Sequence, residues 1–127
     1  MGLLRLTEVK NLQEMSKAKI NFDTFLDIET KLEIKIGMIR SVEMMPKSDK
    51  MLKLEVSFGD DDRRTVMTNI GNRIENIEDL EMVQLPFITN LEPAKIMGVI
   101  SEAMIMVAEN EDGEIEFESF TNGAKLL

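Results

Sequence analysis

Residues 52–68, LKLEVSFGDDDRRTVMT, decide the fold because they predict two strands joined by a turn. Every second residue of the first arm is apolar, and these residues are Leu52, Leu54, Val56 and Phe58. A period of two is typical of a strand that buries one face. Gly59 and the three aspartates that follow it favour a turn, and residues 64–68 supply the second arm. The stretch therefore predicts a β-hairpin with one apolar face.

The same alternation begins upstream of this hairpin. One face of a predicted first strand carries Leu32, Ile34, Ile36 and Met38, opposite Glu33 and Lys35. Downstream, a loop with a capped helical turn is expected between Asn69 and Asp79. A fourth strand is expected to begin near Glu81 and to end by Pro86, because proline is poorly tolerated in a central strand.

The C-terminal part predicts further short strands. Residues 103–108 are continuously apolar and predict a fifth strand that is buried on both faces. Alternation over residues 114–118, after the turn signal at residues 112–113, predicts a last short pair. Short strands separated by turns suggest a small barrel or sandwich, and a helical turn before the fourth strand suits a five-stranded OB-fold barrel. The expected fold class is mainly β, with short C-terminal strands.

Helical periodicity is confined to the N-terminal end. Apolar residues recur at a spacing of three, and they are Leu3, Leu6, Val9 and Leu12, with Met15 following. This pattern predicts an amphipathic helix over residues 1–20, ahead of a barrel domain over residues 21–127. Asn21 or Asp23 is expected to cap a second, short helix. The residues expected on the buried side of that helix are Phe22, Phe25, Leu26 and Ile28.

The composition excludes several classes of site. The 127 residues include no cysteine and no histidine, which removes disulfides, thiolate ligands, and the commonest general base and metal ligand. No Gly-rich phosphate loop or nucleophile motif is present, so a non-catalytic protein without cofactors is expected. Residues 60–62 lack the spacing of a calcium loop and favour a solvated turn. No apolar run suits a signal peptide or a membrane span, so a cytoplasmic protein is expected.

The formal charge of −9 opposes nucleic-acid binding, which depends on Lys and Arg displacing counterions from phosphates. The charge is unevenly distributed, however. Residues 31–73 contain nine basic and seven acidic residues, whereas residues 74–127 contain two basic and twelve acidic residues. A locally positive patch is therefore expected from Arg40, Lys47, Lys50, Lys53 and Arg64. The alternative, that each is an ordinary solvated charge, stays open.

Residues 90–104, NLEPAKIMGVISEAM, place polar residues where packing alone would not require them. Asn90 can bridge backbone groups, Pro93 fixes φ, and Gly98 permits conformations that other residues avoid. Loops supported by a rigid sheet are common sites of function. The stretch therefore predicts a binding loop.

The pattern Asn-Leu-x-Pro-x-Lys-x-x-Gly-x-x-Ser-Glu-x-Met over residues 90–104 resembles the signature loop of the tRNA-binding domain family. Further segments of that family resemble, in the same order, residues 32–37 (LEIKIG), 46–52 (PKSDKML) and 121–126 (TNGAKL). The family includes free-standing dimeric tRNA-binding proteins, CsaA-type secretion chaperones, and domains attached to methionyl-, tyrosyl- and phenylalanyl-tRNA synthetases. The resemblance covers most of the chain and implies an OB-fold.

The candidate tRNA-binding residues combine this resemblance with the positive patch. They are Lys47, Lys50, Arg64, Asn90, Lys95, Ser101 and Met104. Lys95 is the only basic residue of the loop, and the resemblance implies contacts from Lys50 and Ser101. Family members often carry basic residues where this chain has Ala94 and Met97, which leaves the loop with fewer phosphate contacts.

Structural alternatives to these roles stay open. Ser101 and Glu102 can satisfy backbone groups at the start of the strand, and Asn90 can be a structural bridge. Met104 can pack in the core, since methionine often fills irregular gaps. Lys50 can be an ordinary solvated turn residue.

The leading hypothesis is a non-catalytic, homodimeric OB-fold protein that binds tRNA, acting in trans to an aminoacyl-tRNA synthetase. The rival is a CsaA-like chaperone that binds unfolded polypeptides, or a protein-interaction module, and the eleven methionines and the negative charge favour it. Dimerisation is expected because the N-terminal helix and the Leu126-Leu127 end would otherwise expose apolar surface. The alternative, in which the helix folds back on its own barrel, stays open.

Overall fold

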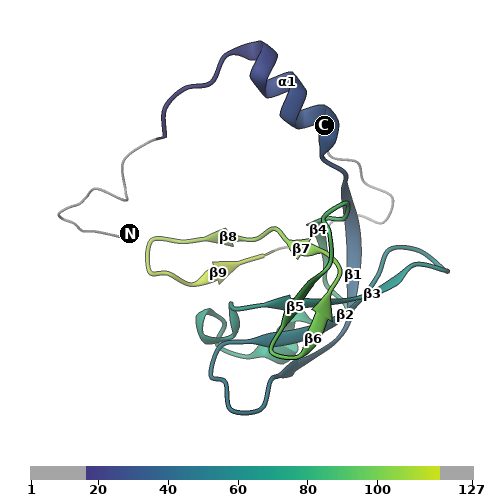
Figure 1. Ribbon diagram of the computed structural model, residues 1–127. Coiled ribbons are helices and arrows are strands. Elements are labelled where there is room, and N and C mark those ends of the chain that lie inside the picture. The colour runs from purple at the N-terminus through teal and green to yellow at the C-terminus, as the bar shows by residue number, and fades with distance from the viewer. Residues whose placement is uncertain (1–16, 118–127) are drawn as a thin grey trace.

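The structure of the protein, a computed structural model, describes residues 17–117 of the chain (Figure 1). Most of the predicted helix over residues 1–20 lies outside the described residues, as does the family-like segment at 121–126. Residues 17–20 are not helical. Within the described range, one α-helix, α1 (Phe22–Lys31), precedes a mainly β body.

Five antiparallel strands form one curled sheet in the order β3-β2-β1-β4-β7. They are β1 (Ile34–Met44), β2 (Leu52–Ser57), β3 (Arg63–Thr68), β4 (Gln84–Ile88) and β7 (Met104–Ile105). Two small hairpins are formed by β5 (Ala94–Ile96) with β6 (Val99–Ser101), and by β8 (Ala108–Glu109) with β9 (Ile115–Glu116). Two 3-10 turns, η2 (Gly71–Arg73) and η3 (Ile77–Leu80), connect β3 to β4. This arrangement confirms the predicted OB-like fold.

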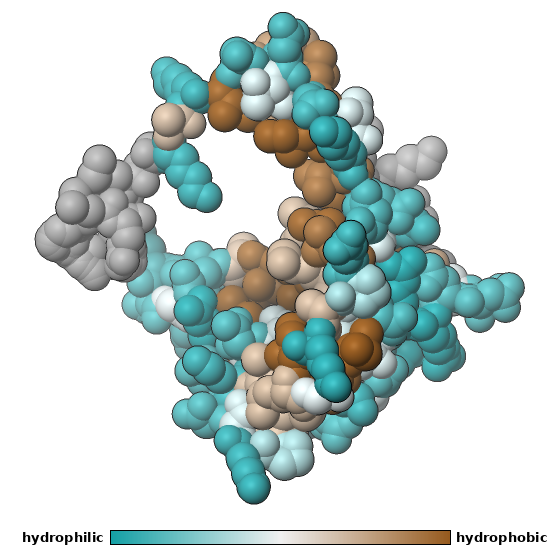
Figure 2. All heavy atoms as spheres, in the orientation of Figure 1, coloured by the Kyte–Doolittle hydropathy of each residue, from teal (hydrophilic) through white to brown (hydrophobic). Residues whose placement is uncertain are grey.

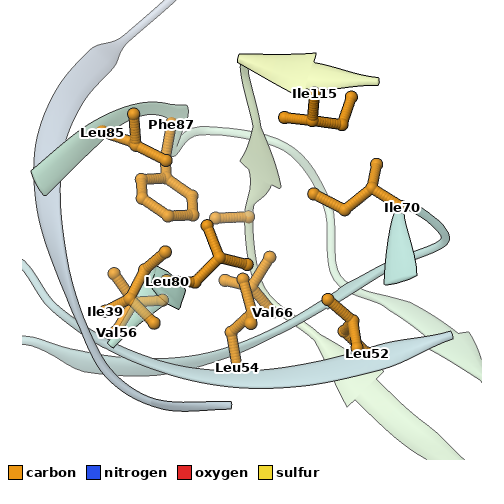
Figure 3. Close-up of a cluster of buried hydrophobic side chains, with 11 residues drawn as sticks. Ile39, Leu52, Leu54, Val56, Val66, Ile70, Leu80, Leu85, Phe87 and Ile115 are labelled. Carbon is orange, nitrogen blue, oxygen red and sulfur yellow. The ribbon is translucent and has the colours of Figure 1, made fainter. Parts of the chain in front are cut away.

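Apolar side chains from β1 to β4 and from η3 fill the interior of the curled sheet (Figure 3). Leu52, Leu54 and Val56 of β2 are fully buried, as the alternation predicted. Phe58 packs edge-on against Phe87, with ring centroids 5.3 Å apart. β2 and β3 pair over their full length, so the predicted hairpin is confirmed.

The burial of side chains along β1 differs from that of a simple alternating strand. The apolar residues share one face, as predicted, and they are Ile34, Ile36 and Met38, but all three are only partly buried. The opposite face, with Gly37 and Ile39, points into the barrel. A Cβ at Gly37 would lie 2.6 Å from side-chain atoms of Phe58 and Val56, so the strand passes too close for a larger residue. A β-bulge between Ile39 and Ser41 then changes the alternation.

The predicted end of the fourth strand was wrong, because β4 continues through Pro86 to Ile88. Pro86 pairs with Ile36 of β1, while its carbonyl accepts the N–H of Met106 on the other side of β4. The N–H and C=O of one strand residue point the same way, so the missing N–H of Pro86 faces β7. The β7 ladder begins only at Phe87. Proline therefore removes no bond from the β1–β4 ladder.

The predicted fifth strand, residues 103–108, is shorter and more exposed than expected. Only Met104 and Ile105 pair with β4. The side chains of Met104 and Met106 are 54% and 39% exposed. Burial on both faces was therefore a wrong prediction, because one face of β7 is uncovered by the described residues.

The 90–104 loop contains a hairpin that the sequence did not predict. β5 and β6 are joined by a two-residue turn, in which Met97 has a φ of 51° and Gly98 a φ of 82°. Positive φ at both central positions is the pattern of a type I′ turn. The special backbone conformation expected at Gly98 is therefore confirmed, and it forms the tip of the hairpin.

The predicted second helix and its cap are confirmed, but its burial is not. Asn21 Oδ1 accepts the N–H of Thr24 at 2.8 Å at the start of α1. No residue of α1 is buried, and the exposed apolar side chains are Phe22, Phe25, Leu26 and Ile28. Figure 2 shows an open hollow between the helix and the barrel, with apolar side chains along the helix where it faces the hollow. The amphipathic pattern was predictable, but the surface that would cover it is not supplied by residues 17–117.

Candidate nucleic-acid interface

Two loops carry exposed lysines toward one end of the barrel. The turn between β1 and β2 contains Lys47 and Lys50, and the β5–β6 hairpin contains Lys95. Both segments lie at the lower end of the barrel in Figure 1. Among the residues that the structure describes, none of these lysines forms an ion pair. In OB-folds, the loops at these two places flank bound nucleic acid.

Hydrogen bonds hold the β1–β2 turn in one shape. Ser48 Oγ accepts the N–H groups of Lys50 and Met51 at 3.2 and 2.9 Å. The carbonyl of Lys50 accepts the N–H of Gly71 at 2.7 Å. A Cβ at Gly71 would lie 2.8 Å from that carbonyl oxygen, so glycine is required for this approach. The turn therefore presents its lysines, including Lys47 with a φ of 64°, from a fixed backbone.

The β5–β6 hairpin has an outer and an inner face. Lys95 pairs with Ile100, and both are exposed. Ile96 pairs with Val99, and both are partly buried. Successive strand residues point to opposite faces, so Lys95 projects into solvent while Ile96 projects toward the barrel.

A largely apolar pocket of about 350 Å³ lies between the two loops. Its walls include Met51, Met67, Thr68, Asn69, Ile96 and Met104. Met51 directly follows Lys50, and Ile96 directly follows Lys95, so both lysine-bearing loops border the same pocket. The tertiary structure thereby brings Met51 of the β1–β2 turn to the same pocket as Ile96 and Met104, although Met51 lies far from them in the sequence.

Ser101 and Glu102 bind the free edge of β3, an arrangement that we call the Ser101–Glu102 clasp. Ser101 Oγ accepts the N–H of Met67 at 3.0 Å and donates to the carbonyl of Ala103 at 3.2 Å. The N–H of Glu102 donates to the carbonyl of Thr65 at 2.9 Å, and Glu102 Oε1 accepts the N–H of Thr65 at 3.0 Å. Because Ser101 is only 7% exposed, its hydroxyl serves the closure of the barrel. The backbone-satisfying role considered for both residues is confirmed.

Arg64 is engaged by its own protein. Its Nε and Nη2 donate to the two carboxylate oxygens of Asp62 at 2.9 and 3.1 Å, and its Nη1 donates to the carbonyl of Thr89 at 2.7 Å. The guanidinium also lies 5.2 Å from the ring centroid of Phe58. The hydrogen bond from Arg64 lowers the pKa of Asp62, and the same bond raises the pKa of Arg64. Arg64 thus ties β3 to the end of β4.

Asn90 bridges the barrel and the segment that leads out of α1. Its Oδ1 accepts the N–H of Glu33 at 2.8 Å, and its Nδ2 donates to the carbonyl of Lys31 at 2.5 Å. The adjacent Thr89 donates its N–H to the carbonyl of Glu33 at 2.9 Å and its hydroxyl to the carboxylate oxygen Oε1 of Glu33 at 2.6 Å. The bridging role considered for Asn90 is confirmed.

The predicted site residues therefore fall into two groups. Those that are exposed on the loops or at the pocket are Lys47, Lys50, Lys95 and Met104. Those that hold the loops in place through internal hydrogen bonds are Arg64, Asn90 and Ser101. Contact with tRNA stays a prediction for every member of both groups.

Two polar residues of the pocket, Thr68 and Asn69, were not singled out from the sequence. Thr68 is the last residue of β3 and Asn69 follows it, and neither side chain forms a hydrogen bond with any described residue. In the sequence Asn69 marks only the start of a loop, and no local pattern distinguishes it. The exposed Arg40 and Arg63 also lack an ion pair within the described range.

Two further features concern residues 17–117 as a whole. No group of three or more Asp and Glu side chains in this range is arranged to hold a metal ion. None of its helices is long and apolar enough to cross a membrane.

Comparison with known proteins gives a family match and several relatives. The family model described as "Putative tRNA binding domain" matches residues 34–126. Methionine–tRNA ligase from Bacteroides fragilis is 37% identical over 99 residues, which are 78% of this chain and 14% of the ligase. The ligase from Methanocaldococcus jannaschii is 40% identical over 85 residues, which are 67% of this chain and 13% of the ligase. The chain thus spans a small part of these relatives, and the family match is to a tRNA-binding domain rather than a catalytic one.

Two solved structures with a similar fold have chains of about the same extent as this one. The MetRS related protein from Pyrococcus horikoshii superposes with a TM-score of 0.69 at 31% identity, covering 87% of this chain and 94% of that one. The chaperone CsaA from Bacillus anthracis superposes with a TM-score of 0.64 at 27% identity, covering 87% of this chain and 100% of that one.

Proposed function

This chain belongs to the tRNA-binding domain family, and from that membership we propose that it binds tRNA without catalysing a reaction. The contacts are made by the β1–β2 turn and the β5–β6 hairpin. Lys47, Lys50 and Lys95 bind phosphates, while Arg64, Asn90 and Ser101 hold the loops that carry them. Because the relatives include methionine–tRNA ligases, the bound tRNA is used in trans by an aminoacyl-tRNA synthetase.

The observation that carries this proposal is the placement of unpaired lysines on both loops around one pocket. Lysines that form an ion pair must give it up to bind a phosphate, whereas Lys47, Lys50 and Lys95 have no such partner among the described residues. Each phosphate contact releases condensed counterions, so these lysines contribute favourable free energy at low salt.

Part of the acidic character of the chain lies away from these loops. The β8–β9 hairpin and its turn carry five of the twelve acidic residues of the 74–127 segment, and these are Glu109, Glu111, Asp112, Glu114 and Glu116. In Figure 1 this hairpin extends from the barrel away from the β1–β2 turn. Asp49 and Glu92 remain on the lysine-bearing loops, so binding is expected to be weak and strongly salt-sensitive.

A filter-binding titration with bulk tRNA at low and high salt tests the proposal. The combined variant Lys47→Ala, Lys50→Ala and Lys95→Ala is expected to reduce the dependence of log K on log salt by about one for each phosphate contact removed. Lys31→Ala is the matched control, because Lys31 is paired with Asp27 on α1. Absence of salt-sensitive binding at micromolar protein would overturn the proposal.

We further propose that the chain forms a homodimer through α1 and the outer face of the sheet. The half-exposed face of β1 continues onto β4 and β7, where Ile34 pairs with Ile88 and Ile88 pairs with Met104. The apolar side of α1 faces the hollow beside the barrel (Figure 2). An apolar helix and an apolar sheet face on one chain form a self-complementary surface, which favours a two-fold pair.

Light scattering of two variants on the same helix tests the dimer. Phe25→Glu places a charge on the apolar side of α1 and is expected to halve the mass in solution. Thr24→Glu adds the same charge at the third helical position, where a glutamate supports the Asn21 cap, and is expected to leave the mass unchanged. A monomeric parent protein, or equal behaviour of the two variants, contradicts this interface.

The rival function, binding of unfolded polypeptides as in a CsaA-like chaperone, is supported by the methionine-lined pocket. Met51, Met67 and Met104 offer an adaptable apolar surface. Suppression of the aggregation of a heat-unfolded protein, with no salt-sensitive binding of tRNA, would favour the rival over tRNA binding.

A further inference from the structure

The geometry points to a nucleobase site: the pocket between the β1–β2 turn and the β5–β6 hairpin takes one unstacked base of the bound tRNA. This inference rests on the proposed function and adds to it a contact that depends on the base rather than on the phosphates. Phosphate contacts position an RNA, whereas contacts to base edges distinguish one sequence from another.

The walls of the pocket suit the flat faces of a base. Met51, Met67, Ile96 and Met104 present apolar surface from four separate segments of the chain. A volume of about 350 Å³ lies within the range of small-molecule pockets, roughly 300–1,000 Å³. Proteins that bind extruded bases hold them between aromatic or apolar side chains, and methionine and isoleucine supply that surface here.

The polar groups of the pocket suit the edge of a base. The Asn69 amide offers a donor and an acceptor, and the Thr68 hydroxyl offers both in one atom. Neither side chain is occupied by another described residue. A ligand that brings its own donors and acceptors, as every base does, therefore satisfies these groups.

The charges at the pocket favour a base over an apolar side chain of a polypeptide. Lys50 and Lys95 stand next to the wall residues Met51 and Ile96, on opposite loops. A nucleotide that inserts its base between the loops keeps its phosphates outside the pocket, and the two loops that border the pocket carry Lys50 and Lys95 on their exposed sides. A hydrophobic peptide carries no negative charge that would pair with these two cations, so charge complementarity favours the nucleotide.

Methyl NMR of the full chain, labelled with ¹³C at the methionine methyl groups, tests the site during a titration with bulk tRNA. A base in the pocket is expected to shift the methyl signals of Met51, Met67 and Met104 upfield, because they would face its ring. Met82, which is exposed at the turn before β4, is the reference signal and is expected to stay in place.

A matched pair of variants tests whether the Asn69 side chain forms hydrogen bonds with the edge of the base. Asn69→Ala is expected to weaken tRNA binding about 2- to 10-fold, the effect of losing one or two hydrogen bonds. Asn72→Ala makes the same change three residues away on η2, outside the pocket wall, and is expected to leave binding within about twofold. Both side chains are exposed, so neither change is expected to disturb folding.

The possible results separate this inference from the proposed function. Salt-sensitive tRNA binding without upfield shifts at the pocket methionines overturns the base site and leaves tRNA binding intact. No tRNA binding at all overturns the proposed function. Shifts of Met51 and Met67 on adding a reduced, carboxymethylated polypeptide, or on concentrating the protein without RNA, identify the occupant as a peptide or a second copy and overturn the base site. Met104 is left out of this comparison because the proposed dimer interface also includes it.

Discussion

Strand β2 and helix α1 both carry regularly spaced apolar side chains, yet the described structure buries one set and leaves the other in solvent. Leu52, Leu54 and Val56 have no exposed surface, whereas Phe22 and Phe25 are 70% and 47% exposed. Both sets were expected to be buried. The difference shows that a periodic pattern reports that a face is apolar without reporting what covers it.

The apolar face of β2 is covered and that of α1 is not, because the two elements have different neighbours in the chain. β2 lies between β1 and β3, its neighbours in sequence, and the sheet curls over its inner face. α1 is joined to the barrel mainly at one end, through the bonds of Asn90 and Thr89 to the Lys31–Glu33 segment. Contiguous exposed apolar surface marks an interaction site in many proteins, which is why the dimer is part of the proposed function.

The largest expected effect is on the free energy of unfolding. Its dependence on protein concentration should differ between variants of β2 and variants of α1. Leu54→Ala is expected to lower the free energy of unfolding by about 2–5 kcal/mol at every protein concentration, because it leaves a cavity in the core. Phe25→Ala is expected to lower stability only at concentrations where the chain pairs, since α1 packs on no core of its own. Urea unfolding followed by circular dichroism at two protein concentrations measures both. If Phe25→Ala lowers the free energy of unfolding by the same amount at both protein concentrations, the proposed difference between α1 and β2 is wrong.

The next effect concerns the Ser101–Glu102 clasp, which closes the buried region. Ser101→Ala is expected to cost about 1–3 kcal/mol, because the N–H of Met67 would remain buried without its acceptor. Ser41→Ala, on the exposed part of β1, is the control and is expected to change stability by less than about 0.5 kcal/mol. Equal unfolding midpoints for the two variants would show that the clasp does not stabilise the barrel.

A smaller effect is expected at the junction of the two regions. Asn90→Ala removes the bridge to Lys31 and Glu33 and is expected to cost about 0.5–1.5 kcal/mol. Amide hydrogen exchange is expected to quicken in α1 while β2 keeps its protection, since β2 stays inside the core. The exposed Asn72→Ala serves as control. Faster exchange throughout β2 would mean that the junction also supports the core.

The smallest expected effect depends on pH. Arg64 lowers the pKa of Asp62 in the folded chain. The carboxylate therefore contributes stability that is complete above its ordinary pKa of about 4 and is lost as the pH falls through the lowered folded value. Asp62→Asn is expected to cost less than about 1 kcal/mol near pH 7, because the pair is partly exposed. The gap between variant and parent should close in acid, and a gap that widens there would contradict this assignment.

Much of the fold was predictable because its signals are local. The alternation from Leu52 to Phe58, the turn after it and the cap at Asn21 each depend on neighbouring residues, and each is confirmed. The errors have a common origin in contacts between distant segments. Pro86 is tolerated because of the side of β4 on which its missing N–H lies, and no local pattern records that side.

The candidate site divides in the same way. The lysines of both loops and the Pro, Gly and Ser-Glu framework of residues 90–104 were found from the sequence, together with the family they resemble. The pocket was not, because its walls come from segments as distant as Met51 and Met104. The role of Arg64 was also out of reach, since it depends on an acceptor at the end of another strand. The backbone-satisfying role of Ser101 was considered from the sequence, but its partner on β3 was not predictable.

The sequence by itself determined a mainly β chain with an amphipathic helix, a hairpin at its centre and a loop typical of tRNA-binding domains. These are properties of residue order, because turns, caps and alternation act over a few residues. Only the tertiary structure decided which of the candidate residues face solvent and which close the barrel. The physical reason is that a buried hydroxyl or guanidinium must find its hydrogen-bond partners within the fold, and those partners lie far along the chain.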